Sequence, residues 1–113
     1  MILRLIEINL YNNGYEIYGH ANQVTCSEVS ILAWAIGNTL CKIDFNSKWH
    51  DEHGYTYLFF DTSIEKAKWI FDDYKHNAKI WGQFKWKDSD VKIVEYNKNI
   101  ELREDLEDTW VKC

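Results

Sequence analysis

The sequence lacks several features that would assign it to particular classes of protein. Its 113 residues contain no proline and five glycines, so the turns depend on Gly, Asn and Asp. No apolar run approaches the ~20 residues that span a bilayer, and the first residues lack the basic and apolar regions of a signal peptide. We therefore expect one cytoplasmic domain with a real core and no membrane partner.

Positive charge is also in short supply. Thirteen Lys and Arg stand against eighteen Asp and Glu, which gives a formal net charge of −5. This balance makes nucleic acid an unexpected partner, although basic and aromatic residues alternate at 84–87 and keep single-strand stacking open as an alternative. The three cysteines (Cys26, Cys41 and Cys113) are an odd number without a CxxC pair, which favours reduced thiols over a disulfide framework.

The hydrophobic pattern predicts strands and helices in the order ββα-ββα-β. The predicted strands cover residues 2–10, 15–20, 43–49, 55–60 and 90–96, and the predicted helices cover about 25–42 and 64–81. Asn12-Asn13-Gly14 predicts the first hairpin turn, because Asn-Gly accepts the positive φ angles of a type I′ turn. We predict a single α+β domain over residues 1–96, with two helices packed on a mostly antiparallel sheet.

An acidic tail, residues 97–113, follows the predicted domain. Its acidic residues gather between 101 and 108. Leu102, Leu106 and Trp110 are spaced at i, i+4 and i+8, which is the spacing of one apolar face of a helix. The tail is therefore predicted to form a short helix that docks on the domain.

His20 and Cys26 are the candidate catalytic residues. His20 ends a predicted strand, where a rigid element holds a side chain beside a loop. Thr25-Cys26-Ser27-Glu28 has the form of a capping box, with Thr25 as N-cap and Cys26 as the first helical residue. A helix N-terminus and a nearby imidazole both favour the thiolate, which is the nucleophilic form. The alternatives are a His bonded to the backbone and a Cys that fills the core.

Two further groups of residues suggest chemistry. The backbone N–H groups of Ser27 and Glu28, at the predicted helix start, are candidate donors to an oxyanion. His50-Asp51-Glu52-His53 carries metal-ligating side chains, but no predicted helix aligns the two His residues, which makes a solvated turn the better interpretation. We predict no metal site and no cofactor.

At Gly19-His20-Ala21 and at residues 25–30 the sequence resembles the ribosomal-processing cysteine protease family, called Prp. That family has a Gly-His-Ala motif at a strand end, and then a Val-Cys-Ala-x-Val-Ser motif that opens a buried helix. Here the second motif is Thr25-Cys26-Ser27-Glu28-Val29-Ser30, with Thr in place of Val and Ser in place of Ala. Family members carry a longer, mobile segment between the His and the Cys, whereas this sequence has only residues 21–25.

The resemblance implies a Cys–His endopeptidase with Cys26 as nucleophile and His20 as its base. The implied substrate is a peptide segment of a ribosomal protein or, as in relatives from phages, of a capsid or scaffold protein, cut beside bulky aromatic residues. The resemblance also implies a homodimer that needs no metal or organic cofactor. The short loop and the added tail favour a second hypothesis, a non-catalytic interaction protein on the same fold.

Overall fold

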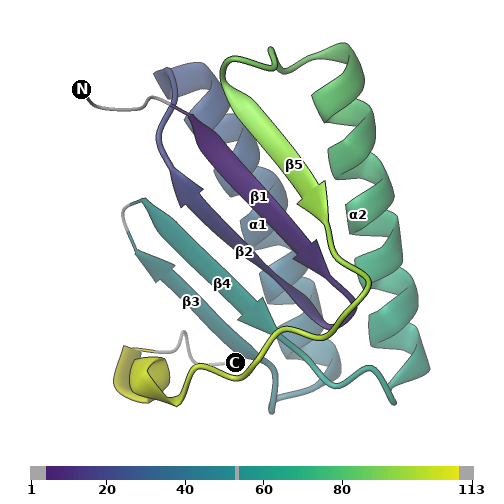
Figure 1. Cartoon of the computed structure of the whole chain (residues 1–113). Coiled ribbons are helices and arrows are strands. Elements are labelled where there is room, and N and C mark those ends of the chain that lie inside the picture. Colours follow the sequence, from purple (N-terminus) through teal and green to yellow (C-terminus); the bar gives the residue numbers. More distant parts are fainter. Residues whose placement is uncertain (1–4, 53, 110–113) are drawn as a thin grey trace.

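In the computed structural model, which describes residues 5–52 and 54–109, the strands and helices follow the order ββα-ββα-β (Figure 1). The strands are β1 (Ile6–Tyr11), β2 (Gly14–Gly19), β3 (Lys48–Glu52), β4 (Tyr55–Phe59) and β5 (Val91–Glu95). The helices are α1 (Gln23–Ile43), α2 (Glu65–Phe84) and the short 3₁₀ helix η1 (Glu104–Thr109). The predicted order of elements is confirmed.

The five strands form one mixed sheet in the order β3-β4-β2-β1-β5. Neighbouring strands are antiparallel except for β1 and β5, which are parallel. The parallel pair follows from the connection through α2, because a parallel neighbour needs a crossover rather than a hairpin. Both α1 and α2 lie on the same face of the sheet (Figure 1). The predicted α+β fold with a mostly antiparallel sheet is therefore confirmed.

The core lies between the sheet and the two helices. Ile8 and Ile17 face each other across β1 and β2, and both are buried on the helix side together with Phe71 of α2. Full burial of one such side chain contributes roughly 1.5–3 kcal/mol. The buried hydroxyl of Tyr15 donates to the backbone oxygen of Ala33, 2.9 Å away. This bond ties β2 to the middle of α1.

The predicted strand at 43–49 is wrong in its position. Helix α1 continues to Ile43, because its buried stripe extends through Leu40, and β3 begins only at Lys48. His50 therefore lies within a strand and is buried rather than being part of a solvated turn, and its Nε2 lies 2.9 Å from Glu52 Oε2.

Helix α1 is long and apolar enough, by length and composition alone, to cross a membrane. The core helix of a globular protein meets the same criteria. In this structure one face of α1 is buried in the core, with Val29, Ala33 and Ile36 among its buried residues. We therefore describe α1 as the central helix of the domain.

The chain after β5 crosses the sheet face opposite the helices (Figure 1). It is fixed there by Ile100, which is buried and hydrogen-bonded to the Asn13 side chain. Leu102 precedes η1 and is 40% exposed. Leu102 and Leu106 therefore do not share one apolar face of a helix, as their spacing predicted. Trp110 lies outside the described residues.

Candidate active site

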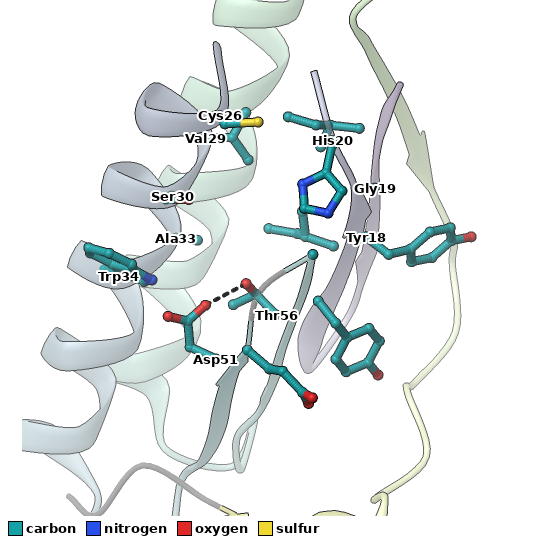
Figure 2. A pocket seen from close by; sticks show the side chains of 15 residues that line it. Tyr18, Gly19, His20, Cys26, Val29, Ser30, Ala33, Trp34, Asp51 and Thr56 are labelled. Carbon is teal, nitrogen blue, oxygen red and sulfur yellow. Dashed lines mark hydrogen bonds between the residues drawn. The ribbon is translucent and has the colours of Figure 1, made fainter. Parts of the chain in front are cut away.

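A cavity of about 360 Å³ contains both predicted catalytic residues, His20 and Cys26 (Figure 2). It lies between α1, the end of β2 and the β3–β4 turn. Much of its wall is apolar, formed by Ile6, Ile17, Val29, Ala33 and Trp34. Asp51 and Glu52 add exposed carboxylates. An apolar hollow with a few polar groups is the usual form of a ligand site.

Cys26 is a partly buried free thiol in the second turn of α1. The helix begins at Gln23, and Asn22 is its N-cap, with its side-chain oxygen accepting from Thr25 N at 2.9 Å. The prediction of Thr25 as N-cap is therefore wrong by three residues. Asn is among the strongest N-cap residues. Its backbone oxygen also accepts from Cys26 N at 2.9 Å, so the cap fixes the position of Cys26.

The earlier helix start also changes the position of Ser27 and Glu28. The N–H groups without helical partners belong to the N-cap residue and the three residues after it, which here are 22–25. The backbone N–H groups of Ser27 and Glu28 follow that turn, so they do not lie at the helix start, and their oxyanion role stays a prediction. The Glu28 carboxylate instead pairs with Lys85, with Nζ and Oε2 3.0 Å apart.

The Cys26 sulfur is in contact with the backbone of Ala21. Ala21 N donates to the sulfur at 3.2 Å, and the thiol is 3.4 Å from Ala21 O. In Figure 2 the sulfur points away from α1, toward the chain segment that carries His20. The short loop thus supplies a contact that sequence patterns did not predict.

His20 follows β2 and is held close to the β3–β4 turn by two glycines. Gly19 has φ of 101° and donates its N–H to Gly54 O at 3.1 Å, while Gly54 has φ of 84°. A Cβ added to Gly54 would lie 2.7 Å from His20 Nε2. The imidazole therefore lies against Gly54. His20 and Cys26 therefore line the same cavity from different elements.

Sequence reasoning did not identify Asn22 and Tyr55 as residues of this region. Asn22 could have been found, because Asn directly before a helical run is a capping signal. Tyr55 lines the cavity and donates its hydroxyl to Glu16 at 2.7 Å. Burial, and then this hydrogen bond, raises the pKa of Tyr55. Tyr55 therefore remains a neutral donor, and its distant partner in the sequence explains why no local pattern revealed it.

The structure also bears on metals and on the other cysteines. Within residues 5–52 and 54–109, no group of three or more His, Cys, Asp or Glu is placed to hold a metal ion. Cys41 is disulfide-bonded, so the expectation of reduced thiols is wrong for this residue. Cys113 lies outside the described residues.

Comparison with solved structures identifies the fold. Two structures of the ribosomal processing protease Prp from S. aureus each cover 85% of this chain, and the chain covers 100% of theirs. The complex with a covalently linked product peptide has a TM-score of 0.59 and 15% identity, and the complex with a substrate peptide has 0.65 and 12%. No protein-family model and no curated protein matches the sequence. The resemblance to Prp predicted from a dozen residues is thus confirmed for the fold.

Proposed function

We propose that this protein is a cysteine endopeptidase that binds a peptide segment in the cavity of His20 and Cys26. The observation that carries the proposal is the presence of a free thiol and an imidazole in one cavity, on a fold shared with Prp. The solved Prp structures contain a substrate or product peptide. The apolar wall around Val29 and Trp34 suits a bulky apolar side chain of such a peptide.

In the proposed reaction, the Cys26 sulfur attacks the carbonyl carbon of the scissile bond and His20 accepts the thiol proton. The C–N bond then breaks, and the imidazolium gives its proton to the leaving amine. Water, deprotonated by His20, attacks the resulting thioester and releases the acid and the thiol. The Ala21 N–H, 3.2 Å from the sulfur, holds the sulfur in position for the attack.

The position of His20 is compatible with this role. In the structure its ring lies against Gly54, and the residue is exposed. Exposed side chains change rotamer within nanoseconds, and catalytic hydrogen bonds often tighten only when substrate is bound. The ring can thus adjust its orientation within the cavity by rotation, without a change of fold.

A cleavage assay tests the proposal. Wild type and Cys26→Ala are incubated with peptides that contain a Phe-Phe pair, and the products are identified by mass spectrometry. We expect wild type to cut beside the aromatic pair, and Cys26→Ala to show no turnover above the peptide alone. Cleavage that persists in Cys26→Ala would show that the sulfur is not the nucleophile.

The second candidate function is a non-catalytic interaction protein, which the short loop favours. Residues 21–25 are held by the Asn22 cap and by the contacts between Ala21 and the sulfur, unlike a mobile lid. This candidate predicts that wild type and Cys26→Ala bind the same peptides equally and cut none. The homodimer, the cytoplasmic location and a ribosomal or capsid substrate stay predictions.

A further inference from the structure

Residues 98–103, here called the strap, are fixed to the sheet face opposite the helices. Asn12 N donates to Lys98 O at 2.9 Å. The Asn13 side chain accepts from Ile100 N at 2.7 Å and donates to Ile100 O at 3.3 Å. Asn13 and Ile100 are both buried, where hydrogen bonds are stronger than in water. The strap is therefore held firmly at the β1–β2 turn.

The strap then contacts two tyrosines of β4. The Tyr57 hydroxyl donates to Glu101 O at 2.7 Å and accepts from Arg103 N at 3.2 Å. Arg103 Nη1 donates to the Tyr55 hydroxyl at 2.7 Å, and its guanidinium carbon lies 5.3 Å from the centre of the Tyr55 ring. Since that hydroxyl also donates to Glu16, Tyr55 is held between Arg103 and Glu16.

The guanidinium of Arg103 is itself held in place by Asp105. Its Nε and Nη2 donate to the two carboxylate oxygens of Asp105, at 3.2 and 2.6 Å. Nη1 remains for Tyr55. A planar fork with several fixed donors permits both contacts at once, which the single ammonium of lysine does not.

Tyr55 connects the strap to the candidate active site. It lines the cavity and follows Gly54, the residue against the His20 ring. It also pairs with Tyr18 near the end of β2. A displacement of Tyr55 thus changes the wall that faces His20.

We propose that Arg103 is a positioning residue for the cavity, and that it holds the wall formed by Gly54 and Tyr55 in a shape that accepts an aromatic side chain. The inference deepens the proposed function and rests on it, because the cavity is the proposed peptide site. The segment that follows the last strand thereby takes part in substrate selection from the far side of the sheet.

The test compares two thiol reagents, iodoacetamide and its N-benzyl derivative, on the full chain. The rate of Cys26 alkylation is followed by mass spectrometry, and the ratio of the benzyl to the small-reagent rate reports the cavity wall. Arg103→Met is expected to lower this ratio about threefold, the size of one lost aromatic contact, with the iodoacetamide rate unchanged. Lys98→Met is the matched control, because Lys98 lies over Tyr96 and not over Tyr55, and it should keep the wild-type ratio.

Tyr55→Phe provides a second variant that keeps the ring and removes the hydroxyl. It should lower the ratio as Arg103→Met does, and the double variant should lower it no further, because both remove the same contact. Arg103→Lys should also give a ratio below that of wild type, because lysine does not keep both contacts of the guanidinium. An unchanged ratio in Arg103→Met, or an equal fall in both rates, would overturn the inference. If Arg103→Met lowers the ratio but wild type cuts no peptide, the proposed function is wrong and the role of Arg103 in shaping the cavity still holds.

Discussion

The two strand-to-helix junctions of this protein occupy equivalent places in the two ββα units, and they differ in chemistry. The first, residues 20–22, connects β2 to α1, and the second, residues 60–64, connects β4 to α2. Each borders a cavity, of about 360 Å³ and about 480 Å³ respectively. The first cavity is lined by His20 and Cys26, whereas the described residues that line the second include neither cysteine nor histidine. The fold supplies a hollow at each junction, and the residues placed there decide whether it can react.

The junctions also differ in how the helix start is fixed. Helix α1 is capped by the Asn22 side chain, four residues before Cys26. The N-cap of α2 is Ile64, whose side chain carries no hydrogen-bonding group. The Asp61 carboxylate at the second junction accepts from Ser63 N at 2.9 Å, within the loop. A side-chain cap therefore accompanies the junction that carries the candidate catalytic residues.

The largest expected effect is on peptide hydrolysis, and it should distinguish His20, at the first junction, from His76, on α2. His20→Gln should lower peptide hydrolysis by about 10²–10⁴-fold, because loss of a general base costs that much. His76→Gln changes an exposed residue of α2 and should leave the rate within about twofold. Both are measured with the same aromatic peptide at neutral pH. Equal hydrolysis rates in the two variants would show that His20 is not the general base.

The second largest expected effect is that of a methyl group at the β3–β4 turn, which should lower protein stability and displace the His20 ring. Gly54→Ala places a Cβ 2.7 Å from His20 Nε2 and keeps φ at 84°, a region that favours glycine. We expect a destabilisation of about 1–3 kcal/mol, with displaced ¹H–¹⁵N NMR signals of the His20 ring. Urea unfolding measures the first effect. An unfolding free energy equal to that of wild type would contradict the strained φ of Gly54, and unchanged ring signals would contradict its close approach to His20.

Much of the fold could be predicted from the sequence, because its signals are local. Asn12-Asn13-Gly14 marks the first hairpin, and the alternation around Ile17 marks β2. The predicted type I′ turn is wrong, because Asn12, Asn13 and Gly14 do not have the positive φ angles that it requires. The boundaries of α1 could not be predicted so well. Asn22 and Thr25 both have side chains that cap helices, and only the packed structure shows that Asn22 takes this role. This error of three residues in the helix start removed the argument for the N–H groups of Ser27 and Glu28 as oxyanion donors.

The candidate site was predictable only where it is contiguous in the sequence. His20 and Cys26 are six positions apart, and the structure places both in one cavity. Gly54, Tyr55 and Arg103 reach the same region through strand pairing and the strap. Such contacts depend on sheet register and on where the C-terminal segment lies, and a single sequence carries no signal for either. The long-range part of a site therefore has to come from the structure.

Removal of the cap at the first junction should have a smaller effect. Asn22→Ala deletes the acceptor of the Thr25 N–H and should lower the free energy of unfolding by about 1 kcal/mol. The rate of Cys26 alkylation by iodoacetamide should change with it, since the Asn22 backbone holds Cys26 N. Asn38→Ala, at an exposed position within α1, is the control and should not destabilise the protein. Equal stabilities of the two variants would contradict the capping role.

The smallest expected effect is a pH dependence at the second junction. Hydrogen bonds from the Ser63 side chain and then from its backbone lower the pKa of Asp61 below its ordinary value of 3.8. Because the pKa is lower in the folded than in the unfolded protein, ionised Asp61 stabilises the fold above that value. This contribution is lost as the pH falls through the folded pKa. Asp61→Asn keeps an acceptor but does not titrate, so the difference in urea midpoint between wild type and variant should shrink from pH 5 toward pH 3. The first junction, residues 20–22, contains no carboxylate. A difference in urea midpoint that stays constant with pH would therefore show that the second junction, like the first, owes its loop structure to uncharged contacts.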